Sequence, residues 1–377
     1  MNQITILTLL CAVLLMACGE RNVSGPGHGN SRGFCISGFD LFSNLAENAD
    51  LFRTECTDFT IEIGGPKLTS VTREYGPSVI TQKKLPFKSA VALAKVKPWS
   101  SWWFPKKENI LFAGGDSSTL GKFDQFRRWA YKQKDLPYPG DSLEFEANSY
   151  SPNSLAWEGL CDAWSLAALS AMEPRNPIEV NLGNSSVTFN VSDLKALLLK
   201  TYEGAPDSQL KYHGEKFIGD NSGWIYPDIF PDQFHRFVEV KLFEKKQAFV
   251  MDHDPGPQVW NVPVYKANFV AESVPNKPNA VFITMWIYSA EPTLPTDREL
   301  VGTRESVREY QYILQGTRNE SGNLIVTTGY WVKGANGVDS RQEHPDYLIE
   351  LPSTERLKRK SWNPNIEIEM VDWLLRN

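Results

Sequence analysis

The sequence predicts an α+β fold, and three observations point to it. Segments with helical periodicity come first along the chain, whereas apolar segments typical of strands dominate its later part. Hydrophobic residues make up 41% and charged residues 22% of the 377 residues, which excludes a disordered, collagen-like or coiled-coil chain. The 24 prolines, 26 glycines and 12% aromatic residues indicate many loops between the elements.

The chain opens with an apolar segment, residues 4–17, that is too short to span a bilayer but matches the core of a secretory signal. Its end, Ala17-Cys18, is typical of a bacterial lipoprotein signal, in which the cysteine becomes the lipidated N-terminus. We therefore expect residues 1–17 to form the signal peptide. A plain secretory signal is the alternative. Residues 18–34, rich in Gly, Ser and Asn, are expected to form a flexible tether.

Helices and strands are expected in the following order. A helix is possible within 36–60, and 61–96 contains extended segments and loops. Apolar spacings of three predict helices at 117–133 and 161–172, the second stopped by Pro174. A short strand at 187–191 precedes a helix capped by Ser192. Later elements are a hairpin of 234–243 with 248–252, strands at 258–265, 280–288, 308–315 and 324–333, and a C-terminal helix.

The five cysteines have different expected fates. Cys11 leaves with the signal and Cys18 carries lipid. Cys35 and Cys56 are the expected disulfide pair in an oxidising compartment, worth about 3 kcal/mol in the chain-entropy model. Cys161 then has no partner, and it is either a buried apolar residue or a nucleophile.

Cys161 has the position of a nucleophile, at the first turn of its predicted helix. A helix N-terminus offers unpaired N–H groups and a partial positive charge, which favour the reactive thiolate. The same N–H groups can stabilise an oxyanion that forms on attack by the sulfur. Residue type, position and the odd cysteine count therefore agree.

A cysteine nucleophile needs a base and a group that orients the base. In the predicted hairpin, His235 and Asp252 are cross-strand neighbours, so Asp252 would hold His235 in its active tautomer. His213, in a glycine-containing loop, is the second choice of base, and His344 lies near a strand. Strand alternation points His253 away from the face of Asp252.

Other classes of site find less support. The sequence has no HxxxH, HExxH or paired CxxC spacing and no calcium-loop spacing, so we expect no metal and no cofactor. A net charge of −6 argues against a nucleic-acid partner, since general nucleic-acid binders normally have a basic excess.

Several blocks, taken in order, resemble the transglutaminase elicitor family, known from secreted oomycete transglutaminases and related bacterial proteins. They are PWSSWWFP, WEGLCDAWSLAALSAMEP, VTFNVSDLKALLLKTY, FHRFVEVKLF and AFVMDHDPGPQVWNVPV. The last block contains Trp260–Pro263, which is similar to the core of the elicitor peptide that plants recognise. The resemblance covers about residues 95–377.

The resemblance implies a papain-like, transglutaminase-like core with the nucleophile helix packed on an antiparallel sheet. It implies Cys161 as nucleophile, His235 as base and Asp252 as orienter of a protein-glutamine γ-glutamyltransferase. The partners would be a protein or peptide glutamine donor and a primary amine acceptor such as lysine. Trp157, Trp164 and Trp260 are expected to line the substrate channel, because a water-poor approach favours amine over water.

The same triad also fits a cysteine peptidase, amidase or deamidase, and a non-catalytic envelope lipoprotein is the third reading. The expected organisation is an N-terminal helical and loop region at 35–150, a catalytic core at 151–355 and a C-terminal segment at 356–377 packed on that core. The protein is expected to be exported, either as a cell-envelope lipoprotein of the outer membrane, held only by the lipid at Cys18, or in secreted form.

Overall fold

The computed structural model describes residues 71–81, 84–214, 228–352 and 356–377. The contacts divide the chain into two units, Met1–Gly33 and Phe34–Asn377, and all described residues belong to the second. The predicted boundaries at residues 150 and 355 fall inside this unit.

Several predictions for the N-terminal part concern residues outside the described ranges. They are the signal peptide, the lipidation of Cys18, the tether, the pairing of Cys35 with Cys56 and the helix within 36–60.

The described helices agree with most of the predicted ones. They are α3 (Val71–Tyr75), α4 (Thr119–Gln133), α5 (Ser142–Ser149), α6 (Cys161–Ser170), α7 (Val191–Lys200), α8 (Pro231–Val238) and α9 (Ile368–Arg376). A π-helix, Glu239–Glu244, continues α8. Short 3₁₀ turns lie at Gly115–Ser117, Asp207–Gln209 and Pro295–Asp297. The helices predicted at 117–133, at 161–172 and at the C-terminus are confirmed.

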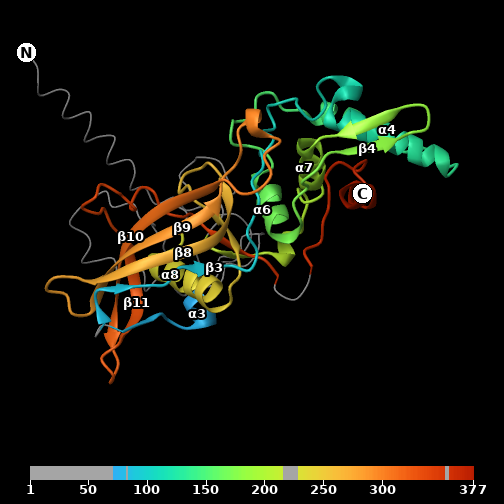
Figure 1. The fold of residues 1–377 in the computed structure, drawn as a ribbon. Coiled ribbons are helices and arrows are strands. Elements are labelled where there is room, and N and C mark those ends of the chain that lie inside the picture. Colours follow the sequence, from blue (N-terminus) through green and yellow to red (C-terminus); the bar gives the residue numbers. More distant parts are fainter. Residues whose placement is uncertain (1–70, 82–83, 215–227, 353–355) are drawn as a thin grey trace, which may run out of the picture. The chain divides into compact units, whose positions relative to one another are not determined.

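An antiparallel sheet occupies the later part of the chain (Figure 1). Its central order is β1-β11-β10-β9-β8-β7-β12-β6, and β2 and β3 also pair with β8. The strands are β1 (Val79–Ile80), β2 (Phe87–Lys88), β3 (Ala92–Leu93), β6 (Lys211–His213), β7 (Phe249–Asp252), β8 (Asn261–Ser273), β9 (Ala280–Ala290), β10 (Glu305–Arg318), β11 (Leu324–Trp331) and β12 (Leu348–Glu350). A separate hairpin joins β4 (Ile178–Asn181) to β5 (Ser186–Phe189). Mixed helix and antiparallel sheet is the predicted α+β class.

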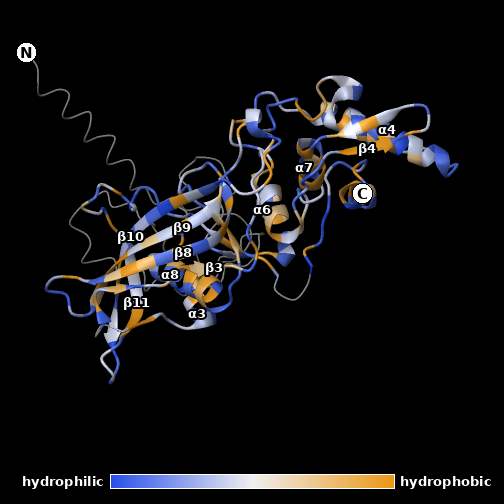
Figure 2. Ribbon diagram, viewed as in Figure 1, coloured by the Kyte–Doolittle hydropathy of each residue, from blue (hydrophilic) through white to orange (hydrophobic). Residues whose placement is uncertain are grey.

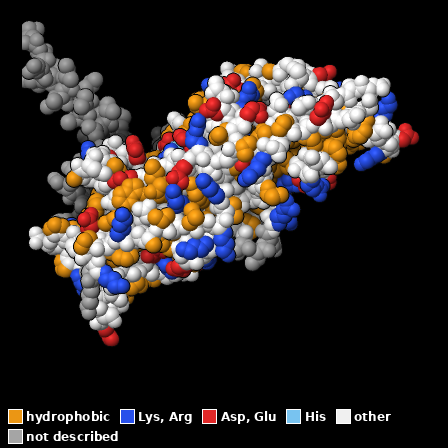
Figure 3. Space-filling view, viewed as in Figure 1, with side chains coloured by type: hydrophobic (Ala, Val, Ile, Leu, Met, Phe, Trp, Pro, Cys, Tyr) orange, Lys and Arg blue, Asp and Glu red, His pale blue; other side chains and the backbone are white. Residues whose placement is uncertain are grey.

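The core forms where helices cover the sheet and one another. Helix α6 packs on β8, α8 packs on β10 and β11, and α7 packs against α6 and α9. Helix α7 is largely hydrophobic, whereas the outer end of α4 is hydrophilic (Figure 2). On the visible surface, acidic and basic side chains are interspersed (Figure 3).

Two local predictions were wrong. Residues 234–243 form α8 and the π-helix instead of a strand, and β7 pairs with β8 and β12. The apolar side chains of Phe234, Phe237 and Val238 recur at helical spacing, and Pro231 occupies the first turn, where proline is favoured. Ser192 is not the cap of α7; that helix begins after Asn190, whose backbone N–H donates to the Asp193 side chain at 2.9 Å.

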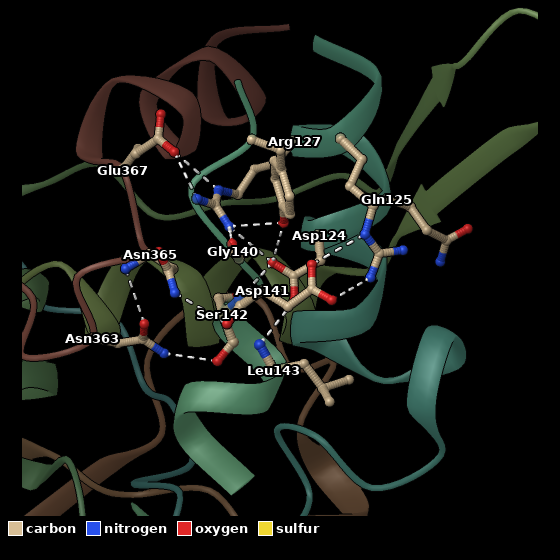
Figure 4. A network of polar contacts seen from close by, with 12 residues as sticks. Asp124, Gln125, Arg127, Gly140, Asp141, Ser142, Leu143, Asn363, Asn365 and Glu367 are labelled. Carbon is tan, nitrogen blue, oxygen red and sulfur yellow. Dashed lines mark hydrogen bonds and ion pairs between the residues drawn. The ribbon is translucent and has the colours of Figure 1, made fainter. Parts of the chain in front are cut away.

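A buried polar network ties α4 to the start of α5 and to the C-terminal segment (Figure 4). Arg127 is fully buried and pairs with Asp124 at 3.1 Å and with Glu367 at 2.8 Å. Asp124 in turn accepts the backbone N–H groups of Ser142 and Leu143, both at 2.8 Å. Polar groups of three segments therefore meet in one place.

Candidate active site

Cys161 is the first residue of α6, as predicted. The turn before it packs against the PWSSWWFP block, residues 98–105, because the N–H of Leu160 donates to the carbonyl of Trp103 at 2.6 Å. A Cβ at Gly159 would meet the Trp103 ring at 2.6 Å and its carbonyl at 2.7 Å, so only glycine fits there. Trp103 thus fixes the turn that presents the sulfur.

The Cys161 sulfur is enclosed by polar groups of the chain. Its Sγ lies 3.6 Å from the carbonyl oxygen of Val259 and 3.7 Å from Oδ1 of Asp162. Cys161 is only 4% exposed. The side chain is therefore largely shielded from solvent.

Burial of Cys161 acts against the effect of the helix N-terminus on its charge. The pKa of Cys161 is raised well above its ordinary value, chiefly because burial disfavours the charged form and also because of the Asp162 carboxylate. A backbone hydrogen bond from Asn261 opposes the rise. Burial thus outweighs the helix N-terminus, and the sulfur rests as a neutral thiol.

Asp252 ends β7 and pairs across the sheet with Asn261, the first residue of β8. Its Oδ1 accepts the backbone N–H groups of Trp260 at 3.0 Å and Asp254 at 3.2 Å. Burial raises the pKa of Asp252 to about 8, against the effect of these two N–H donors. The Val259–Trp260 peptide lies between Asp252 and Cys161, because its N–H donates to Asp252 Oδ1 at 3.0 Å and its carbonyl lies 3.6 Å from Sγ.

Asn261 and Tyr347 are site residues that the sequence analysis did not identify as such. The Asn261 side-chain NH₂ donates to the Asp162 carboxylate and, at 2.9 Å, to the Tyr347 hydroxyl. Its backbone carbonyl accepts from Ser165 Oγ on α6 at 2.8 Å, which joins the strand to the helix. Asn261 lies in the block AFVMDHDPGPQVWNVPV, so the sequence did signal that segment.

His235 lies elsewhere. Its Nδ1 shares a hydrogen bond of 2.8 Å with Tyr312, its Nε2 lies 3.5 Å from Glu239, and its ring contacts Phe269. Phe269 lies eight residues after Asn261 on β8, which is roughly 26 Å at about 3.3 Å per residue. The structure therefore does not bring His235 to Cys161 or to Asp252.

The other described histidines have partners of their own. His253 accepts from Arg308 at 2.9 Å, and its pKa falls to about 3, chiefly through burial, so it is neutral near pH 7. His213 lies 3.4 Å from Glu350, and the His344 ring N–H donates to Asp228 at 2.7 Å. None of these contacts involves the Cys161 sulfur.

The three tryptophans expected in the substrate channel occupy different environments. Trp164 is fully buried and donates to the Trp99 carbonyl at 2.9 Å, a core position that does not fit a channel wall. Trp260 is half-buried and meets Trp103 edge to face at 5.5 Å. Trp157 is half-buried and packs against the core. Of the three, Trp260 lies beside Asp252, to whose carboxylate its backbone N–H donates.

Replacing His235 with Gln is expected to change kcat/KM for a reaction at the Cys161 sulfur by no more than about threefold, because His235 is remote from the sulfur. A general base contributes roughly 10² to 10⁴. A hundredfold loss in correctly folded protein would show that His235 is the base after all. His213→Gln, assayed beside it, tests the second histidine in the same way.

Among the described residues, no group of three or more His, Cys, Asp or Glu side chains is arranged to hold a metal ion. No helix in those ranges has the length and apolar character needed to cross a bilayer.

Two of the comparisons with known proteins found a match. The crystal structure of the GP42 transglutaminase from Phytophthora sojae matches with a TM-score of 0.56 and 19% identity, over 81% of this chain and 96% of that chain. At this identity the likeness shows the fold. No curated protein matches the sequence. Residues 148–301, which contain Cys161, Asp252 and Asn261, match the transglutaminase elicitor family model, and this confirms the resemblance seen in the sequence.

Proposed function

We propose that the protein is a transglutaminase-type acyltransferase that forms isopeptide bonds between protein glutamines and primary amines through a thioester on Cys161. One observation carries the proposal. A helix-initiating cysteine has the Asp162 carboxylate 3.7 Å from its sulfur and contacts the Val259–Trp260 peptide, whose N–H donates to Asp252, within the segment that matches the family model.

In this mechanism Asp252 moves the proton. Its pKa of about 8 lets it exchange a proton near neutral pH, as a general acid–base group requires. The carboxylate takes the proton of Cys161, the sulfur attacks the glutamine carboxamide, and the proton leaves on ammonia. We expect the N-terminal N–H groups of α6 to stabilise the charge that the carbonyl oxygen gains. An amine then attacks the thioester and restores the thiol.

The test is covalent incorporation of a dansylated amine into casein by the purified chain, with Cys161→Ala as the matched control. Label with the wild type and none with Cys161→Ala is the expected result. Equal label with both proteins contradicts the assignment. Ammonia release from casein without label would identify a deamidase that uses the same cysteine.

The N-terminal segment supports a separate proposal about location. We propose that the chain is exported and that lipid on Cys18 anchors it to the cell envelope, because Cys18 follows an apolar signal and a small residue. Mass spectrometry of the mature N-terminus is expected to find an acylated Cys18. An unmodified start at another residue contradicts this.

A further inference from the structure

Two buried oxygen atoms beside Cys161 lack a hydrogen-bond donor among the described residues. They are Oδ2 of Asp252 and Oδ1 of Asn261. Asp252 is fully buried and Asn261 is 1% exposed. Buried acceptors without donors are rare in native proteins and often mark a functional site.

The two oxygens belong to neighbouring side chains. Asp252 and Asn261 are register partners in the β7–β8 pair, so their side chains lie on one face with Cβ atoms about 5 Å apart. The remaining polar atoms are already used, because Asp252 Oδ1 accepts two backbone N–H groups and Asn261 NH₂ donates to Asp162 and Tyr347. A carboxylate accepts hydrogen bonds and does not donate them. The Asn261 atom that contacts Asp162 is therefore the amide nitrogen, and the other atom is Oδ1.

The pair lies next to the reacting sulfur. The Asn261 side chain donates to Asp162, whose Oδ1 lies 3.7 Å from Sγ, and Asp252 Oδ1 accepts the Trp260 N–H at 3.0 Å. Val259, two residues before Asn261, touches Sγ at 3.6 Å through its carbonyl. Each of the two side chains is thus one hydrogen-bonded group away from a contact of Sγ.

We propose that Asp252 Oδ2 and Asn261 Oδ1 form a two-acceptor site for the N–H groups of a primary carboxamide, and that Asn261 thereby determines specificity for this leaving group. The inference rests on the proposed acyl transfer at Cys161. A primary carboxamide presents two N–H donors, which match two acceptors. An ester leaving group presents none and leaves both oxygens unsatisfied.

The chemistry at this site balances. The sulfur–carbon bond forms, the carbon–nitrogen bond breaks, and the Cys161 proton reaches the nitrogen, which leaves as ammonia. By microscopic reversibility, the nitrogen of the amine that attacks the thioester enters at the same place. With its carboxyl protonated, Asp252 can satisfy Asn261 Oδ1 in the resting protein. When Asp252 loses that proton, Asp252 Oδ2 and Asn261 Oδ1 both lack a donor. The N–H groups of the substrate can then donate to them.

The test compares two leaving groups on one acyl chain, a glutamine dipeptide and the matching p-nitrophenyl ester. Ammonia and nitrophenolate release are measured for the wild type, Asn261→Ala and Tyr347→Phe. Asn261→Ala is expected to lower kcat/KM at least tenfold more for the carboxamide than for the ester, because a polar site discriminates strongly between substrates with and without its partner group. Tyr347→Phe disturbs the same network but keeps Oδ1, so both substrates should fall by the same factor.

An equal fall for both substrates in Asn261→Ala would overturn the inference and leave a merely structural role. Absence of any Cys161-dependent ester acylation in the wild type would instead refute the proposed function. A second measurement needs no variant. Carboxamide N–H groups that donate to Asp252 favour its ionised form and so lower its pKa in the substrate complex. For the carboxamide, the pH profile of kcat should therefore lie at lower pH than the profile of kcat/KM. For the ester, the two profiles should not be shifted in this way. Coincident profiles for the carboxamide would also overturn the inference.

Discussion

Replacing Asp252 with Asn is expected to lower kcat/KM for acyl transfer at least a hundredfold and, above pH 8, to stabilise the folded protein. The loss of activity follows because Asn cannot take up the proton of Cys161, and general acid–base groups contribute roughly 10² to 10⁴. The carboxamide of Asn can still accept the N–H groups of Trp260 and Asp254 that now bind Asp252. The fold around the site should therefore remain.

The stability effect has a defined sign and pH window. Burial raises the folded pKa of Asp252 from its ordinary 3.8 to about 8, so between these values the folded state holds a proton that the unfolded state has released. Stability of the wild type therefore falls through this window by at most about 1.4 kcal/mol per pH unit from this group. An Asn at this position does not make stability depend on pH. The stability of Asp252→Asn relative to the wild type therefore increases up to about pH 8 and is constant above that pH.

Urea unfolding of both proteins at pH 5, 7 and 9 measures this difference, and the pH profile of transfer measures the catalytic part. Wild-type kcat/KM should rise with pH through about 8, because the carboxylate is the active base. Asp254→Asn is the matched control, since Asp254 lies in the same loop and its side chain accepts the Gly256 N–H at 2.7 Å. A gain in stability that does not depend on pH would contradict the assignment.

The elements that could be predicted from the sequence are those whose apolar residues follow one dominant periodicity, either that of a helix or that of a strand. The helix at Cys161 has a clear start and a proline stop, and the long strands β9 to β11 bury enough side chains to be recognised, whereas the strand predicted at 258–265 covers only the start of β8. Residues 234–243 fit both periods, because Val238, Val240 and Leu242 alternate while Phe234, Phe237 and Val238 follow a helical face. Pro231, at the first turn, was the available signal for the helix.

The site was harder to predict because its chemistry depends on burial. Sequence position placed Cys161 at a helix N-terminus, but only the structure shows that packing against Val259 and Asp162 raises the pKa of the thiol. Likewise, Asp252 was expected to orient a histidine, whereas its nearest cross-strand neighbour is Asn261. A strand register cannot be fixed when the partner strand is misassigned.

Replacing Arg127 with Met is expected to lower the free energy of unfolding by about 3–5 kcal/mol, the cost of removing one partner from a buried ion pair. Methionine fills a similar volume without charge. It leaves Asp124 buried and Glu367 without the guanidinium that now binds it at 2.8 Å (Figure 4). It also removes the donors to the Tyr138 hydroxyl at 3.0 Å and to the Gly140 carbonyl at 2.8 Å.

The adjacent Arg128→Met supplies the matched control. Arg128 also pairs with an aspartate, Asp141 at 2.7 Å, but this pair is 44% and 29% exposed. Exposed ion pairs contribute about 0–1 kcal/mol, so this variant should stay close to the wild type in urea unfolding. If both variants unfold at the same urea concentration, burial does not decide the cost of these charges. If only Arg127→Met is destabilised and also releases the C-terminal segment to protease early, the network of Asp124, Arg127 and Glu367 is what holds α9 to α4.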